Sequence, residues 1–196
     1  MWQISATYSL STSDLNLSTG DSAVERRRSL SAALERRIGD DWTVQASAGA
    51  SLGGDLTVND ARYDFAPGWA ASLGASYRIL DGSGIEPFLV AAITAAVGSA
   101  KTTRGDEQAT FTALDARLSL VVGKVFWNSL APYAVARVFG GPVFWSLQGD
   151  SLTASDKYHV QLGLGLLATA GGRTGAYFEI VPLGERAVSF GANVAF

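Results

Sequence analysis

The chain has 196 residues, of which 47% are hydrophobic and 17% charged, and its formal net charge is −3. This length fits one domain over residues 1–196, and the acidic balance argues against a nucleic-acid partner. With no cysteine and one histidine, a disulfide framework and a thiolate metal site are excluded, and we expect neither a metal ion nor a cofactor.

The dominant pattern along the chain is an alternation of apolar and small polar residues, which is typical of β-strands. It is clearest from Trp42 to Leu52, where Thr43, Gln45 and Ser47 fall between apolar residues. No stretch approaches the roughly 18 uninterrupted apolar residues that a transmembrane helix needs. Read in chain order, the alternating runs predict ten strands, near residues 2–12, 24–38, 42–53, 67–80, 85–98, 110–127, 131–147, 157–170, 174–183 and 187–196.

One of these segments also carries signals for a helix. Residues 22–38 are rich in helix formers and begin with the capping-box pattern Ser22-x-x-Glu25. Leu30, Ala32 and Leu34 nevertheless keep a period of two, and without this strand the count would be odd, whereas bacterial barrels have even counts. We therefore expect a strand here.

The connections fall into two classes. Tight turns are expected at 39–41, 81–84, 128–129 and 171–173, and longer segments lie between them, at 13–23, 54–66, 99–109 and 148–156. Short and long connections alternate until the last link, 184–186, which is short where a long one is expected. Short periplasmic turns alternating with longer outer loops are typical of a transmembrane antiparallel up-and-down β-barrel, of about ten strands or alternatively eight. A soluble β-sandwich, the other all-β candidate, has no reason to segregate its loops in this way.

Amphipathic aromatic residues fall near the predicted strand ends. Rings with one apolar and one hydrogen-bonding edge favour the lipid headgroup level. If the chain starts in the periplasm, two girdles are predicted, with Trp2, Trp42, Tyr77 and Trp127 at the periplasmic ends and Trp69, Trp145 and Tyr158 at the outer ends.

The last strand alternates on one face and ends on an aromatic residue, through Val188, Phe190, Ala192, Val194 and Phe196. This ending resembles the assembly signal that the barrel-insertion machinery reads in bacterial outer-membrane proteins. In size and plan the whole chain resembles the small barrels of the OmpA/OmpX type and their ten-stranded relatives. The resemblance implies a bacterial outer-membrane location and does not imply a reaction. We expect a monomer in contact with outer-membrane lipid, and we expect residues 1–196 to be the mature form with Met1 added as a start residue.

Polar and charged side chains are predicted to fill the interior, because a small barrel has a filled lumen rather than an open pore. Buried charges are tolerated only when paired, so a hydrogen-bonded plug is expected, with a structural or surface-interaction role for the barrel. The alternative is a porin-like path for ions or small solutes, opened when the pairs rearrange. The residues predicted to face inward are Glu35, Arg37, Arg78, Glu86, Asp115, Arg117, Tyr133, Arg137, Gln161, Tyr177 and Glu179.

Two further features are candidate sites. His159 is the weak catalytic candidate for a rim-located lipid or peptide hydrolase, and general acid-base chemistry needs a partner within hydrogen-bond reach. Lipid A deacylases carry Ser two residues after the histidine, and outer-membrane proteases carry Asp two residues before it; Gln161 and Lys157 stand there. We therefore expect no enzymatic activity. Arg26 and Arg28 lie toward the outer end of their strand, where bidentate arginine pairs would suit lipopolysaccharide phosphates.

Overall fold

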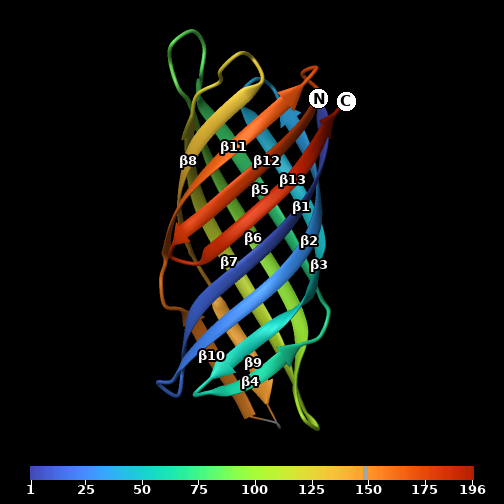
Figure 1. The fold of residues 1–196 in the computed structure, drawn as a ribbon, viewed down its shortest axis with the longest axis vertical. Helices are drawn as coiled ribbons and strands as arrows, with labels where there is room; N and C mark the ends of the chain where they lie inside the picture. Colours follow the sequence, from blue (N-terminus) through green and yellow to red (C-terminus); the bar gives the residue numbers. More distant parts are fainter. Residues whose placement is uncertain (148–149) are drawn as a thin grey trace.

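Alternating residues form extended strands along almost the whole chain. The structure, a computed structural model, describes residues 1–147 and 150–196, and Figure 1 shows one continuous tilted sheet with both termini at the same end. The strands are β1 (Trp2–Leu17), β2 (Ser22–Ile38), β3 (Trp42–Val58), β4 (Ala61–Phe65), β5 (Gly68–Asp81), β6 (Phe88–Arg104), β7 (Glu107–Gly123), β8 (Leu130–Gly140), β9 (Pro142–Leu147), β10 (Asp150–Asp156), β11 (Val160–Ala170), β12 (Thr174–Leu183) and β13 (Arg186–Ala195).

The sheet closes on itself because its first and last strands pair. β1 and β13 are antiparallel from Gln3 opposite Ala195 to Thr12 opposite Arg186. Reciprocal backbone hydrogen bonds between Trp2 and Phe196, 2.8 and 2.9 Å long, continue this seam to the chain ends. Closure leaves no unpaired edge along the seam, which is the condition for a sheet to span a bilayer. No helix in residues 1–147 and 150–196 has the length and apolar character needed to span a membrane.

The predicted count of about ten strands, like the alternative of eight, is wrong for the hydrogen-bonded segments, of which the described residues form thirteen. Two of the additional segments, β4 and β10, lie where loops were expected. The third, β9, belongs to the predicted strand 131–147, which is interrupted at Gly141 and so forms β8 and β9. A Cβ atom at Gly141 would lie 1.9 Å from the carbonyl oxygen of Leu114, so no side chain fits there. The pairs β4–β5, β8–β9 and β10–β11 each make one interrupted passage, so the thirteen segments traverse the barrel ten times.

Residues 22–38 form a strand, which confirms the prediction made against their helix propensity. β2 pairs with β1 on one side and with β3 on the other over nearly its full length. A central strand of a closed sheet obtains hydrogen bonds on both edges, and this tertiary pairing overrides the intrinsic preference.

The outward face is apolar over the part of the barrel next to the chain termini, which we call the periplasmic end after the predicted orientation, and we call this apolar part the membrane band. Leu118 on β7 is 59% exposed and Leu73 on β5 is 68% exposed, so no neighbouring side chain covers either residue. Their sequence neighbours Ser119 and Ser72 face the lumen. An apolar exterior around a polar interior is the arrangement expected when the surrounding solvent is lipid.

At the outer end the strands continue past the membrane band and their polarity reverses. On β1, Leu15 and Leu17 face inward and are buried, whereas Asp14 and Asn16 face outward. The same reversal on neighbouring strands produces one apolar cluster inside the barrel, which we call the outer core. It consists of Leu15, Leu17, Ala23, Leu56, Tyr63, Phe65, Ala100, Ala109, Phe111, Val143 and Trp145.

The longer outer loops predicted at 13–23, 54–66, 99–109 and 148–156 are therefore wrong over most of their length. Their described residues are mainly strand, joined by tight turns, and residues 148–149 lie outside the described part. Alternation continues in these segments with its apolar phase pointing inward, which lets the strands extend into water around a buried core. The hairpin of β12 and β13 turns between Leu183, where β12 ends, and Arg186, where β13 begins. Beyond this turn β1 pairs with β10 instead, and the wall narrows from ten strands to eight. Eight strands leave an interior that side chains can fill.

Trp145 corrects the predicted outer girdle. It is 4% exposed, its ring lies edge-on to Tyr63 at 4.8 Å, and its Nε1 donates to the Oγ1 of Thr102 at 2.9 Å. Trp145 shares the inward phase of Tyr133 and Arg137 on the same passage, so it enters the outer core. The other predicted girdle residues, Trp2, Trp42, Trp69, Tyr77, Trp127 and Tyr158, are all exposed.

The membrane band predicts opposite tolerance at adjacent positions of β7. Replacing Leu118 with Arg exposes a charge to hydrocarbon and should lower the free energy of unfolding by about 2 to 4 kcal/mol. Ser119→Asn, on the lumen side, should change it far less. Reversible unfolding in lipid vesicles measures both variants, and equal losses would contradict a lipid-facing band.

The outer core predicts a second asymmetry on the same strand. Phe111 is 1% exposed, so Phe111→Ala should cost about 3 to 5 kcal/mol through lost burial and the cavity left behind. Thr110→Ala, one residue away on the outward face, should cost under about 0.5 kcal/mol. Denaturant unfolding of the two variants compares them, and a loss confined to Thr110→Ala would contradict the assigned orientation.

Candidate functional site

The lumen enclosed by the membrane band holds two adjoining cavities. One of about 680 Å³ lies toward the periplasmic end, and one of about 620 Å³ lies at mid-barrel. Ser31, Gln45, Ser47 and Tyr177 line both cavities, so the polar space is continuous from the periplasmic mouth to mid-barrel. The lumen stays unfilled here because the inward positions of the first strands are mostly Ser and Thr, whose side chains are small.

A charged cluster sits on the wall formed by β8, β11 and β12. Arg137 donates from one Nη atom to both carboxylate oxygens of Glu179, at 2.8 and 3.0 Å. The hydroxyl of Tyr133 donates to the same carboxylate at 3.1 Å. The two charged side chains are 18% and 13% exposed, so the lumen holds this pair mostly away from water. Nearby, the hydroxyl groups of Tyr177 and Thr7 lie 2.5 Å apart, joining β12 to β1.

A second cluster lies farther out, directly below the outer core. Arg117 pairs with Asp115 at 2.9 Å and with Glu185 at 3.1 Å. Gln161, which is 2% exposed, donates from Nε2 to Glu185 at 2.6 Å. Glu185 therefore organises this cluster, although sequence reasoning placed it only in a turn. Its signal was the unexpectedly short link 184–186, which ends the last hairpin inside the barrel wall.

Three predicted lumen residues lie near the periplasmic mouth. Glu35 faces inward and accepts a long hydrogen bond of 3.5 Å from Gln3. Arg37 is exposed and donates from Nε to the carbonyl oxygen of Asp40 at 3.2 Å. Arg78 pairs with Asp41 at 3.2 Å. These contacts stay at the rim, so the structure does not join them to the two deeper clusters.

Glu86 is a correction, because it does not lie in the lumen. It is exposed in the turn before β6, and its carbonyl oxygen accepts a hydrogen bond of 2.5 Å from the Nζ of Lys124. The strand was expected to begin at residue 85 but begins at Phe88. Pro87 has no N–H to donate to a ladder, so Glu86 stays in the turn.

An arginine that sequence reasoning missed lies half-buried against the rings of the outer core. Arg27 pairs with Glu25, and its guanidinium carbon lies 4.4 Å from the centre of the Phe65 ring and 4.7 Å from that of Phe111. Aromatic faces stabilise a cation that has lost its water. The alternation that places Arg26 and Arg28 outside requires Arg27 to point inward, and this was the available signal. The charged pair and the two rings close the interior above the polar lumen.

A hydrogen-bonded pair of turns fastens the outermost hairpins to each other. Asp21, between β1 and β2, accepts from Asn59 at 2.9 Å and from Thr19 at 2.8 Å. These hydrogen bonds lower the pKa of the Asp21 carboxyl, because they stabilise its charged form. The carboxylate thus keeps its partners at neutral pH.

The last candidate feature is His159, together with any group of side chains that could hold a metal ion. His159 is exposed between β10 and β11, and its Nδ1 lies 3.2 Å from the carbonyl oxygen of Phe139. Among the described residues no carboxylate pairs with this ring, and no group of three or more His, Cys, Asp or Glu residues has the geometry to hold a metal ion.

Comparisons with known proteins agree on the fold. The translocator domain of the autotransporter NalP from Neisseria meningitidis superposes with a TM-score of 0.58 at 13% identity, over 100% of this chain and 88% of that one. The outer membrane protease OmpT from Escherichia coli gives 0.58 at 10% identity, over 99% and 97%. The outer membrane protein OprG from Pseudomonas aeruginosa gives 0.56 at 11% identity, over 100% and 96%. No family model and no curated protein matches the sequence.

The chain is a small bacterial outer-membrane β-barrel. The matched structures share the closed antiparallel sheet, and the exposed membrane band gives an independent physical reason for the same location. At these identities the likeness concerns the fold, and it carries neither the protease activity of one neighbour nor the transport role of another to this chain.

The Arg137–Glu179 pair predicts a penalty for removing one charge but not both. Glu179→Gln should destabilise the barrel by about 1 to 3 kcal/mol, between the values for exposed and fully buried pairs, because Arg137 loses its counter-charge. The double variant Glu179→Gln with Arg137→Gln should recover most of that loss. Denaturant unfolding in detergent measures both, and a double variant no more stable than the single one would argue against the pair.

Proposed function

We propose that this barrel is a plugged, non-enzymatic membrane protein that presents its outer extension, the part of the strands beyond the membrane band, as a rigid structure at the bacterial surface. The observation that carries the proposal is the position of the outer core. The polar lumen opens toward the periplasm and ends below the packed rings of Phe65, Phe111 and Trp145. An ion would have to cross this apolar layer without water, at a cost of several kcal/mol or more.

The outer extension supports a surface-interaction role. Its outward face is polar, its turns are short, and Asp21 and Asn59 join two of them. Such a platform needs little ordering when it binds a partner, and pre-organisation of this kind lowers the entropic cost of association. The lack of a carboxylate partner for His159 in the described residues supports the non-enzymatic part of the proposal.

The terminal strand supports our proposal that the barrel-assembly machinery recognises this chain. Phe190 and Val194 are exposed on the membrane band, and Phe196 closes the seam with Trp2. A strand that pairs last and joins both ends of the sheet is suited to be read before closure.

The test is a planar-bilayer recording with purified protein. The natural chain should give no stable conductance steps, because the outer core seals the lumen. The double variant Phe111→Ser with Trp145→Ser hydrates the same layer and should conduct, provided that its unheated gel migration shows a folded barrel. Stable steps from the natural chain would overturn the plugged assignment and favour a narrow pore.

A further inference from the structure

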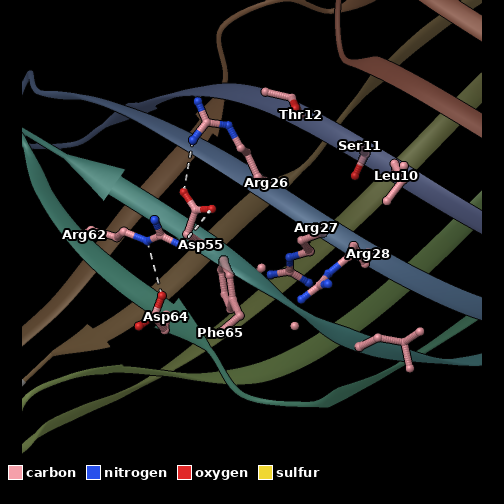
Figure 2. A pocket seen from close by; sticks show the side chains of 13 residues that line it. Leu10, Ser11, Thr12, Arg26, Arg27, Arg28, Asp55, Arg62, Asp64 and Phe65 are labelled. Atoms are coloured by element: carbon pink, nitrogen blue, oxygen red, sulfur yellow. Dashed lines mark hydrogen bonds and ion pairs between the residues drawn. The ribbon is translucent and has the colours of Figure 1, made fainter.

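A basic pocket lies at the outer limit of the membrane band, and its lining includes both outward-facing residues and the inward-facing Arg27 and Phe65. It has a volume of about 580 Å³ and is lined by Leu10, Leu52, Arg26, Arg28, Asp55 and Arg62, among others. Figure 2 shows these side chains gathered over β1, β2, β3 and β4. The two leucines belong to the membrane band and the charged residues to the outer extension, so the pocket joins the two surfaces.

The strand register places two rows of side chains across this pocket. The upper row runs from Arg186 through Thr12 and Arg26 to Asp55. The lower row, one step closer to the membrane, runs from Val188 through Leu10 and Arg28 to Gly53. Arg26 and Arg28 are therefore on one face, about 6 to 7 Å apart along the strand. Arg28 lies between apolar neighbours, at the level where headgroups replace hydrocarbon.

The upper cations are already paired. Arg26 lies 3.3 Å from Asp55, and Arg62 lies 3.7 Å from Asp55 and 3.3 Å from Asp64. The dashed contacts in Figure 2 converge on these two carboxylates and none reaches Arg28. Among the described residues, Arg28 makes no ion pair and no side-chain hydrogen bond. An exposed guanidinium without a counter-ion, next to an apolar surface, is suited to an external anion.

A glycine bulge makes room for that anion. The β2–β3 register shifts between Arg28 and Ser29, and the residue opposite Arg28 is Gly53, which carries no side chain. A Cβ atom placed on Gly53 would lie 3.9 Å from the Nη2 of Arg28, so any larger residue would fill the space beside the guanidinium. The bulge thus leaves the planar donor edge of Arg28 open for bidentate contacts.

We propose that this pocket binds the phosphate of a lipid in the outer leaflet, with Arg28 as its principal ligand and Leu10 and Leu52 against the acyl chains. A guanidinium matches the geometry of a phosphate through two parallel hydrogen bonds. The position of Arg28 at the upper limit of the membrane band favours a lipid phosphate, such as those of lipid A, over a soluble anion. Arg26 and Arg62 stay paired with Asp55 and Asp64, so the uncompensated positive charge for the phosphate comes from Arg28.

The experiment titrates purified, folded protein in zwitterionic detergent with bisphosphorylated lipid A and counts bound lipid by native mass spectrometry. Arg28→Gln should weaken binding by about tenfold, the loss expected for a charge-assisted hydrogen-bonded contact. Arg28→Lys keeps the charge without the bidentate geometry and should lose less. Lys101→Gln, another exposed outward cation of the outer extension, is the matched control and should bind like the natural chain. Unheated gel migration verifies that each variant is folded.

Two further arms distinguish the source of the phosphate. Dephosphorylated lipid A should bind the natural chain about as weakly as lipid A binds Arg28→Gln. Excess inorganic phosphate should not displace lipid A, because it has no acyl chains to place against Leu10 and Leu52. Equal binding by Arg28→Gln and the natural chain, an equal loss in Lys101→Gln, undiminished binding of the dephosphorylated lipid, or displacement by free phosphate would each overturn the proposal.

Discussion

The change of solvent along each strand is the constraint on which the rest of this structure depends. A strand that begins in hydrocarbon must present apolar residues outward, because lipid cannot satisfy polar groups. The same strand, once it emerges into water, is stabilised by the opposite arrangement, with apolar residues inside. β1 shows both conditions, since Leu10 faces lipid, whereas Leu15 and Leu17 face the interior. The barrel is therefore a membrane protein for most of its length and resembles a soluble barrel at its outer end.

This reversal decides where charge can reside inside the barrel. In the membrane band the interior is mainly polar, with a few buried apolar side chains such as Val135 and Val181, so ion pairs such as Arg137–Glu179 link the strands across it. Directly above, aromatic rings fill the interior of the eight-stranded part, and the half-buried Arg27 contacts Glu25 and two aromatic faces. The short last hairpin causes the narrowing, and Glu185 at its tip connects the two regimes through Arg117. The seal and the polar lumen thus have a common origin in one short connection.

The alternating pattern predicted the closed all-β barrel and the inward phase of residues such as Arg117 and Arg137, and the resemblance to small outer-membrane barrels implied its location. A period of two specifies which face a residue occupies as long as the strand carries no bulge. It does not specify which face is in water, and for this reason it predicts neither the inward apolar phase of the outer segments nor the burial of Trp145. Glu86 was misplaced by the start of one strand, which lies at Phe88. The partners of Glu185 depend on strand tilt and closure, and these follow from pairing between residues far apart in the sequence.

The bulge in β3 shows how little sequence is needed to set this arrangement. Up to Ser51 the odd-numbered residues of β3 face the lumen, and without an extra residue Asp55 would follow them inward and Leu56 would face out. The register instead skips one residue between Ser51 and Gly53, so that Asp55 pairs with Arg26 on the outside and Leu56 is 1% exposed in the outer core. A Cβ atom on Gly54 would lie 1.9 Å from the carbonyl oxygen of Arg26, so the crossing requires glycine there. One inserted residue and one glycine thus supply the outer core with a leucine, and the skipped position leaves Gly53 opposite Arg28.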